Sequence, residues 1–584
     1  MQPATALGES NHVTPTLTRL ARPLLLGLVI AALASPLAAQ TGASTPLDLL
    51  QLFRPSISGS YLAGQQALEE LNTTEAATYF NQAAQGDWDN PILVERSFIA
   101  FAADGQIGEA ASVAKHLLSL DRKNELAELV VASEAIKERR YRAAEAMLGQ
   151  ISQDTFSGIT GAILRAWALV GDGRAAEADQ LLQKLGETGL QDFLVFHRAL
   201  LAEAAGKRGE ALDLAGAAFD NEPYVARIVE VYSRMLANDG QFDAAADVIA
   251  QFEAQGLSHP VVTEVKKAVE ARQRPGIFTA NVQIGAAEMF HGIGSALARD
   301  GSKDLALVFL RLGSYLDPKS DVIALAVGQL LDSEGQHLAA NVIYDAVPAR
   351  SPMKPMAVVR IAQNLDATGD RAEAIRRLRN IVATRPGDLD AVSALGDLLR
   401  YDEQYGEAAK AYTQALEISG GTARADWRFF YVRGIAYERD KAWPQAEADF
   451  LAALKLNPDQ PQVLNYLGYS WIDMDMHLDQ ALGMIEKAVE AQPRDGYIID
   501  SLGWAFYKLG RIEEAVETLE RAVMLLPNDP EINDHLGDAY WKAGRRLEAR
   551  FQWNIAKSVD AIGTVAERVG PKLEDGLTPQ NVTQ

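Results

Sequence analysis

Residues 500–511 read DSLGWAFYKLGR, and residues 534–545 read DHLGDAYWKAGR. The two segments begin 34 residues apart, and each has a glycine at its fourth position, an aromatic residue three positions later and a closing Gly-Arg. An alanine follows each of the first glycines by twelve residues, and a large side chain follows each alanine by four. Self-similarity at a fixed period of this length is the signature of a repeat architecture.

Each shared position has a physical reason in a hairpin of two antiparallel helices. Packed helix axes lie about 8–10 Å apart, so the closest contact leaves room only for small side chains such as glycine and alanine. The aromatic and the large residue fill the space beside that contact. Proline lacks a backbone N–H, so Pro458, Pro493 and Pro527 are suited to end the second helix of three units.

The same spacing continues upstream and predicts fourteen units. The first position of each unit is small except at Phe98, and the second is always alanine. The first positions are Gly64, Phe98, Ala132, Ala166, Ala199, Ser233, Gly294, Gly328, Ala362, Gly396, Gly434, Gly468, Gly503 and Gly537. A 34-residue period with this order of small and large residues is the tetratricopeptide pattern. We therefore expect an all-α chain, an α-solenoid of about fourteen tetratricopeptide (TPR) hairpins in a right-handed superhelix.

One irregular step predicts a boundary inside the array. Ser233 and Gly294 are 61 residues apart, nearly one unit too many, and the extra stretch contains Pro260, Pro275 and Gly276. These residues favour one bridging helix at about 260–272. The expected organisation is a signal peptide at 1–39, an N-terminal sub-array at 40–255, a bridging segment at 256–283, a C-terminal sub-array at 284–558, and a capping helix with a polar tail at 559–584.

The first forty residues differ from the rest of the chain. Arg19 and Arg22 precede an apolar run at 23–34, and small residues follow up to Ala39. This order is typical of a secretory signal peptide, and we expect cleavage after Ala39. The run is short for a membrane span of about 20 residues, so an uncleaved anchor is the less favoured alternative. The sequence thus predicts a periplasmic or secreted protein without an integral membrane span in its mature chain.

Composition and motifs narrow the function classes. The net charge of −23 disfavours a nucleic-acid partner, and the absence of cysteine excludes disulfides, thiolate nucleophiles, cysteine-ligated metals and a lipid-bearing cysteine. The eight histidines show no HExxH motif and no helical ligand spacing, and GxGxxG, GxxxxGK[ST] and GxSxG motifs do not occur. His535 is interpreted as a surface or groove contact. The sequence predicts no catalytic residue, no metal site and no cofactor, and we expect a protein that is not an enzyme.

The first helices of stacked hairpins form a concave wall, and function is expected in recognition of a protein or peptide there. In tetratricopeptide families the wall positions lie three residues before, and one and four residues after, the first small position. Aromatic and polar residues at these positions have the makings of a binding hot spot, and the aspartates favour a basic or mixed-charge partner. The alternative is that the aromatic rings belong to the hairpin core. The predicted protein-binding residues are Tyr431, Asn465, Tyr469, Asp500, Trp504, Tyr507, Asp534, Asp538 and Trp541.

Residues 465–556 are more specific than a generic repeat. NYLGYSW at 465–471, DMDMHLDQA at 473–481 and the two opening segments resemble the C-terminal repeats of proteobacterial cell-envelope tetratricopeptide proteins. The best understood of these are lipoprotein adaptors that bind a periplasmic carboxyl-terminal processing protease and present cell-wall hydrolases to it. The resemblance implies an adaptor role with those partners. This chain departs from them in having no cysteine for a lipid anchor.

Three functional hypotheses follow from the sequence. The leading one is a periplasmic adaptor or scaffold that binds other proteins in its concave groove. The second is an assembly factor for envelope or secretion machinery, which would accompany membrane complexes. The third is an enzyme with an unrecognised site at 256–290.

Overall fold

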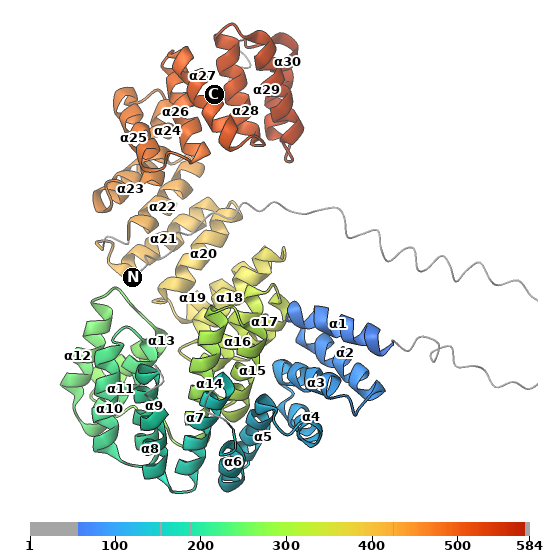
Figure 1. The fold of residues 1–584 in the computed structure, drawn as a ribbon. Coiled ribbons are helices and arrows are strands. Elements are labelled where there is room, and N and C mark those ends of the chain that lie inside the picture. Colours follow the sequence, from blue (N-terminus) through green and yellow to red (C-terminus); the bar gives the residue numbers. More distant parts are fainter. Residues whose placement is uncertain (1–55, 152–154, 186–189, 424–425, 579–584) are drawn as a thin grey trace, which may run out of the picture. The chain divides into compact units, whose positions relative to one another are not determined.

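The chain folds into helices throughout its described part. The computed structural model describes residues 56–151, 155–185, 190–423 and 426–578. These residues form thirty α-helices and no strand (Figure 1), which confirms the expected all-α class. The predicted signal peptide at 1–39 and residues 579–584 of the predicted polar tail lie outside the described residues.

Twenty-eight of the thirty helices, all but α13 and α30, pair as consecutive hairpins, fourteen in total. The first helices are α1 (Ile57–Glu69), α3 (Pro91–Asp104), α5 (Glu125–Lys137), α7 (Phe156–Gly171), α9 (Gln191–Ala204), α11 (Ala226–Asp239), α14 (Val282–Arg299), α16 (Asp321–Ser333), α18 (Lys354–Ala367), α20 (Leu389–Tyr401), α22 (Trp427–Arg439), α24 (Pro461–Asp473), α26 (Gly496–Lys508) and α28 (Pro530–Lys542). The second helices are α2 (Thr73–Gly86), α4 (Ile107–Leu120), α6 (Tyr141–Leu148), α8 (Ala175–Leu185), α10 (Arg208–Asn221), α12 (Phe242–Glu253), α15 (Lys303–Leu316), α17 (His337–Ala346), α19 (Arg371–Thr384), α21 (Tyr405–Ser419), α23 (Trp443–Leu456), α25 (Leu478–Ala491), α27 (Ile512–Leu525) and α29 (Arg546–Val559).

The small residues of the repeat lie at the closest approach of each hairpin. A Cβ atom placed on Gly434 would lie 2.7 Å from Cε1 of Phe450, and one on Gly537 would lie 2.4 Å from Cδ1 of Trp553. Both distances are shorter than a van der Waals contact, so the large residue of the second helix occupies the space that glycine leaves open. The alanine of the second helix is buried in all fourteen hairpins. This arrangement confirms the physical reading of the repeat.

Local signals begin and end the C-terminal helices. The Asp495 carboxylate accepts hydrogen bonds from the backbone N–H groups of Tyr497 and Ile498 at the start of α26. Asp529 accepts one from the N–H of Ile532 at the start of α28. These aspartates satisfy N–H groups that have no partner inside the helix. Pro527 follows the last residue of α27 by two positions, as expected for a residue that cannot continue a helix.

The bridging segment forms one further helix, α13 (Pro260–Glu270), within the stretch where the sequence predicts it. Its apolar face, which includes Val262, Val265 and Val269, is buried, and it packs against α11 and α12. The largest hydrophobic core continues across this segment, from Ala67 to Ile361. The hairpins before and after α13 therefore share one core.

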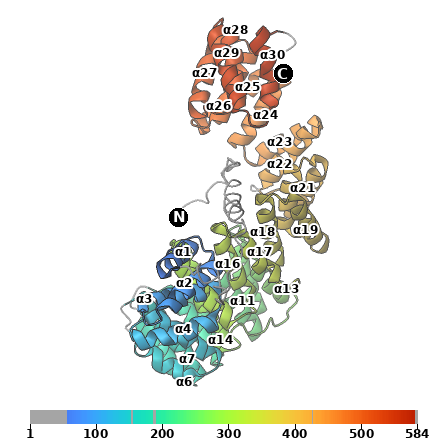
Figure 2. The same ribbon diagram turned by 90° about the vertical axis from the view of Figure 1, so that its right-hand side faces the viewer.

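The hairpin α14–α15 packs against first helices of the N-terminal hairpins, namely α3, α5, α7 and α9 (Figures 1 and 2). A Cβ atom placed on Gly285 of α14 would lie 2.0 Å from Cη2 of Trp167 on α7. The Gln283 amide donates a hydrogen bond of 2.8 Å to the carbonyl oxygen of Ile136, and the Lys137 ammonium donates one of 2.5 Å to that of Tyr315. The chain's own hairpin thus covers N-terminal first helices.

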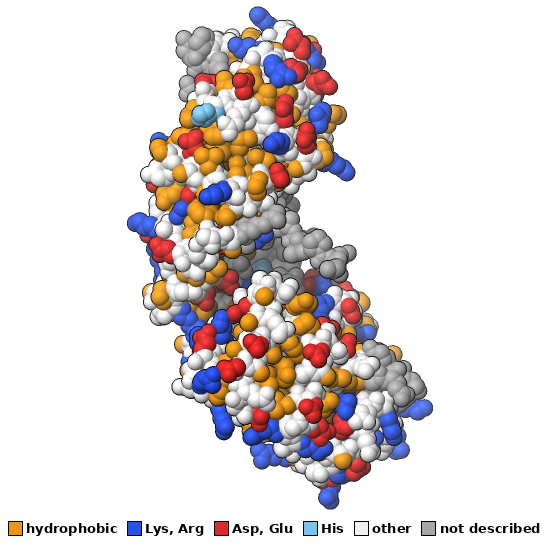
Figure 3. All heavy atoms as spheres, turned by 90° about the vertical axis from the view of Figure 1, so that its left-hand side faces the viewer, with side chains coloured by type: hydrophobic (Ala, Val, Ile, Leu, Met, Phe, Trp, Pro, Cys, Tyr) orange, Lys and Arg blue, Asp and Glu red, His pale blue; other side chains and the backbone are white. Residues whose placement is uncertain are grey.

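One face of the described surface mixes both signs of charge, and hydrophobic side chains gather in both its upper and its lower half (Figure 3). Among the described residues, no helix is both long and apolar enough to cross a membrane.

Candidate protein-binding surface

The nine predicted binding residues lie on the four first helices α22, α24, α26 and α28. The structure divides them into two groups by exposure. Tyr431, Asn465, Tyr469 and Trp541 are half-buried. The other five are buried: Asp500, Trp504, Tyr507, Asp534 and Asp538.

The last two aspartates bind the C-terminal helix α30 (Thr564–Asp575) of the same chain. The Lys572 ammonium donates hydrogen bonds of 2.7 Å to Asp534 and 2.8 Å to Asp538, and all three side chains have no exposed surface. Arg568 donates a further bond of 2.8 Å to Asp534. Asp538 also accepts a bond of 3.0 Å from the indole N–H of Trp553. The negative charge of this end is therefore neutralised within the chain, and the predicted acidic wall does not face outward here.

A second buried cluster joins α26 to α28. Nδ1 of His535 lies 3.0 Å from both carboxylate oxygens of Asp500, and the imidazole stacks on Trp504, which in turn stacks on Tyr507. Burial lowers the pKa of His535, but the Asp500 carboxylate more than offsets this effect and raises that pKa to about 9. The surface contact inferred for His535 is wrong, because its side chain is only 1% exposed. Its ring instead fills the space between two stacked repeats.

A group of half-buried aromatic residues lies on α22 and α24. Only Gly434 and Ala436 of the thirteen residues of α22 are buried. The Tyr431 ring lies edge-on to the Tyr466 ring, 6.0 Å between centres, and next to Trp427. The Tyr466 hydroxyl donates a hydrogen bond of 3.1 Å to Glu438. We define the aromatic surface as the half-buried residues Trp427, Tyr431, Asn465, Tyr466 and Tyr469.

Two polar groups lie among the rings of the aromatic surface. Oδ1 of Asn465 is buried and has no hydrogen-bond partner among the described residues. Burial and the nearby Asp500 carboxylate raise the pKa of the Tyr469 hydroxyl above its ordinary value, so this group remains a neutral donor and acceptor. Sequence reasoning missed Trp427 and Tyr466. Tyr466 lies two residues before Gly468, outside the three wall positions of the repeat, and only the density of aromatic residues pointed to it.

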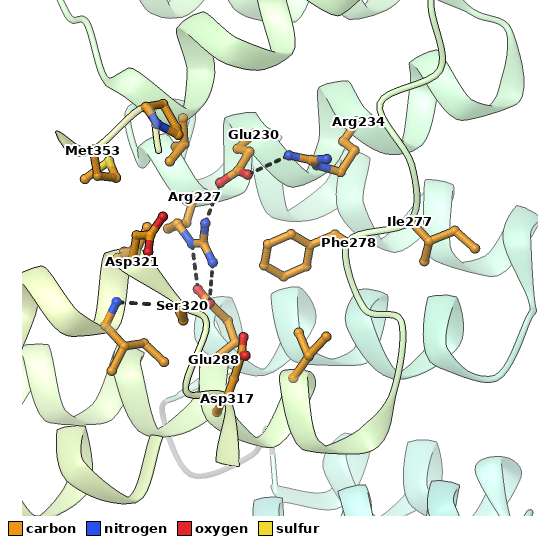
Figure 4. A pocket seen from close by; sticks show the side chains of 16 residues that line it. Arg227, Glu230, Arg234, Ile277, Phe278, Glu288, Asp317, Ser320, Asp321 and Met353 are labelled. Carbon is orange, nitrogen blue, oxygen red and sulfur yellow. Dashed lines mark hydrogen bonds and ion pairs between the residues drawn. The ribbon is translucent and has the colours of Figure 1, made fainter. Parts of the chain in front are cut away.

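A pocket of about 260 Å³ lies between α11, α14 and the segment that follows α13 (Figure 4). Arg227 donates two hydrogen bonds to Glu288, of 2.9 and 2.6 Å, and one of 2.5 Å to Glu230. Its guanidinium lies 4.7 Å from the centre of the Phe278 ring. Burial raises the pKa of Glu288, but Arg227 more than offsets it and holds that pKa well below its ordinary value. These pairs tie α11 to α14, which gives the charges of this pocket a structural role.

Comparisons with known proteins agree with the repeat. Models of the tetratricopeptide repeat family match residues 359–421, 393–461 and 503–544. A TPR repeat-containing protein of Pseudomonas aeruginosa is 32% identical over 89 residues, which are 15% of this chain and 15% of that protein. The human protein O-mannosyl-transferase TMTC1 is 22% identical over 220 residues, 37% of this chain and 24% of that protein. The chain thus spans no more than a quarter of either relative.

Among solved structures, the Cut9–Hcn1 hetero-tetramer of APC/C is similar over 91% of this chain and 98% of the solved chain. Its sequence identity is 14% and its TM-score is 0.37. The family matches and the helical hairpins together show that the chain contains tetratricopeptide repeats.

Proposed function

We propose that this chain is a periplasmic adaptor that binds proteins through the first helices of its C-terminal repeats. The observation that carries the proposal is the aromatic surface, where α22 and α24 hold four half-buried aromatic rings, three of which lie next to one another. Rigid aromatic rings with a few directional polar groups are the composition of binding hot spots. Stacked helical repeats commonly serve as protein-binding scaffolds, which supports the same role.

In the N-terminal repeats, less of the surface of the first helices is accessible to a partner. The hairpin α14–α15 covers first helices there, and Val308 of α15 is fully buried. At the other end, α30 engages the groove positions Asp534 and Asp538 of the last hairpin. The first helices between these two self-contacts include α22 and α24. We therefore place the main partner contact on the aromatic surface.

The character of the surface fits a partner with apolar anchors and backbone polar groups. The buried aspartates are already paired with Lys572 and His535, so a basic partner is not required for charge balance. The Tyr469 hydroxyl can bond to a partner backbone. The resemblance of residues 465–556 to envelope adaptors supports the finer proposal that the chain presents cell-wall hydrolases to a carboxyl-terminal processing protease.

Affinity capture from an envelope extract tests the adaptor function. The full chain is compared with the double variant Tyr431→Ala and Tyr469→Ala. A matched control is Tyr224→Ala, an exposed tyrosine outside the aromatic surface. We expect the wild type and the control to retain a protease or hydrolase that the double variant loses, while all three proteins keep the same helical content. Capture that is equal for all three contradicts the assignment of the surface.

The periplasmic location is tested separately by cell fractionation. We expect the chain in the periplasmic fraction, with its N-terminus at Gln40. A chain that stays in the cytoplasm would contradict the location, and it would leave the binding surface to be judged by the capture experiment alone.

A further inference from the structure

The second helices of the hairpins carry two outward positions, two residues before and two residues after the buried alanine. In most hairpins these positions hold polar or small residues. Examples are Thr74 and Thr78 on α2, Asp243 and Asp247 on α12, Gly406 and Lys410 on α21, and Glu513 and Glu517 on α27. Large apolar residues occupy both positions only on α17 and α29, within the described hairpins.

On α29 the two positions are Leu547 and Phe551, which are 76% and 70% exposed. They are four residues apart on one helix, so their side chains lie side by side on its outer face. The same helix carries three exposed cations, which lie about 60–100° around the helix axis from Leu547. These cations are Arg546, Arg550 and Lys557. None of the three forms an ion pair with the described residues, and the Arg546 guanidinium lies 5.0 Å from the centre of the Trp541 ring. We call these five residues the α29 face.

On α17 the apolar pair is Leu338 and Val342, with exposed fractions of 80% and 72%. This helix, His337–Ala346, contains no lysine or arginine. The α17 pair therefore matches the α29 pair in position and exposure but lacks the row of cations. The difference gives α29 a distinct chemistry in a chain whose net charge is −23.

We propose that the α29 face is a second docking surface, which binds an acidic amphipathic helix of a partner protein. The partner's apolar stripe covers Leu547 and Phe551, and carboxylates along one side of that stripe pair with Arg546, Arg550 and Lys557. An amphipathic helix presents this combination of an apolar row and a charged border. The α29 face lies on the second helix of its hairpin, whereas the aromatic surface lies on first helices, so an adaptor has separate places for two partners. The proposal does not depend on the aromatic surface being occupied.

The charges around the α29 face favour a partner helix as its occupant over a membrane or a second copy of this chain. A bilayer is much wider than the α29 face and would also meet the preceding second helix, α27, whose exposed residues include Glu513, Glu514 and Glu517. Anionic lipid would be repelled there. Two antiparallel copies of α29 that face each other about a twofold axis would bring the same cationic flanks together, which is also unfavourable. A partner helix of about ten residues is long enough to cover the α29 face and too narrow to reach the glutamates of α27.

A designed peptide tests the chemistry of the α29 face directly. The probe is a fluorescent amphipathic helix of about 18 residues with leucine at i, i+3, i+4 and i+7 and glutamate on its borders. Its matched control has lysine in place of every glutamate. Anisotropy with the full chain should show saturable binding of the acidic peptide, and much weaker binding of the basic one.

Variants of the full chain locate the peptide. Arg550→Glu with Lys557→Glu, and separately Leu547→Ser with Phe551→Ser, should each weaken binding of the acidic peptide by about tenfold or more. All four side chains are exposed, so these changes should leave the fold intact. The matched control, Leu338→Ser with Val342→Ser on α17, should bind the peptide as the wild type does. Equal binding of both peptides, or no effect of the α29 variants, would overturn the proposal.

Two further measurements test whether a membrane or a second copy of this chain occupies the α29 face instead of a partner helix. Sedimentation with vesicles of phosphatidylglycerol should leave the chain in solution, and retention that the α29 variants abolish would assign the face to a membrane instead. Sedimentation velocity of the chain alone should give the same species for the wild type and for Leu547→Ser with Phe551→Ser. A dimer that this double variant dissociates would assign the face to a second copy.

Discussion

At the scale of single residues, a glycine at the first position of a repeat stabilises its hairpin because it has no side chain to displace the large residue of the second helix. Gly434→Ala should lower the free energy of unfolding of the C-terminal repeats by about 1–3 kcal/mol, because the new methyl group meets the Phe450 ring. Gly483→Ala on α25 is the matched control, since no neighbouring atom lies within 4 Å of its new Cβ. The control should be neutral or stabilising by up to about 1 kcal/mol, because alanine favours a helix. Urea denaturation followed by circular dichroism distinguishes the two variants, and equal losses would contradict this packing.

The His535–Asp500 pair predicts a pH dependence. The folded-state pKa of about 9 lies above the ordinary value of 6.5, so the stabilisation is complete below pH 6.5 and is lost as the pH rises through 9. The C-terminal repeats should lose up to about 3 kcal/mol of stability across this window. Urea midpoints followed by tryptophan fluorescence measure the loss, since the imidazole stacks on Trp504. The double variant Asp500→Asn with His535→Gln should show a flat profile, and the same slope in it would assign the effect to another group.

The sequence predicted which helices carry the candidate site residues, but it did not predict which of these residues are buried. The repeat register correctly assigned Asp534 and Asp538 to a first helix. It gave no sign that they are buried, because their partner Lys572 lies in a helix outside the repeat pattern. Trp541 is half-buried for the same reason, because it lies against Gly576, which follows α30 and is also outside the repeat pattern. A Cβ atom placed on Gly576 would lie 1.9 Å from the Trp541 ring. That glycine adopts a positive φ of 74°, which side chains rarely allow.

At the scale of elements, α30 completes the last hairpin. Ending the chain at Ala561 removes Arg568 and Lys572 and leaves Asp534 and Asp538 without these cations, a change that costs about 3–5 kcal/mol for a buried pair. Hydrogen exchange should then show loss of protection in α28 and α29 but not in α14–α16. A chain that ends at Thr578 retains α30 and is the control. Unchanged protection of α28 in the shorter chain would show that α30 is dispensable.

The hairpin α14–α15 should stabilise the N-terminal repeats. Gly285→Ala forces a methyl group to within 2.0 Å of the Trp167 ring, so α14 must move away from α7. We expect faster hydrogen exchange in α5 and α7. Gly209→Ala on α10, where the new Cβ has open space around it, is the control and should leave exchange unchanged. Equal protection of α7 in both variants would contradict this role of α14.

The individual hairpins could be predicted from sequence, whereas their mutual packing could not. Hairpin formation depends on the spacing of small and large residues over one period, which the sequence displays directly. The packing of α14–α15 against α3, α5 and α7 depends on contacts between residues more than a hundred positions apart, such as Gln283 with Ile136. Because α14 and α15 carry the same register as the other hairpins, the repeat pattern does not distinguish them.

At the scale of the whole molecule, the accessible first helices and the α29 face support an account of the chain as an adaptor with two docking surfaces. The first is the aromatic surface, and the second is α29 with its cations. Self-contacts at α14–α15 and α30 cover first-helix positions elsewhere. We propose that partner proteins bind the repeats that these self-contacts leave uncovered.

Site-specific photo-crosslinking in intact cells shows whether a partner protein lies against the C-terminal first helices. A photoreactive benzoylphenylalanine replaces Tyr469 in the full chain, and a second chain carries it at Asp247, an exposed outward position on α12. After irradiation of intact cells, we predict that a partner protein is cross-linked from position 469 and not from position 247. A partner cross-linked equally from both positions, or from position 247 alone, would contradict the assignment of protein binding to the C-terminal first helices.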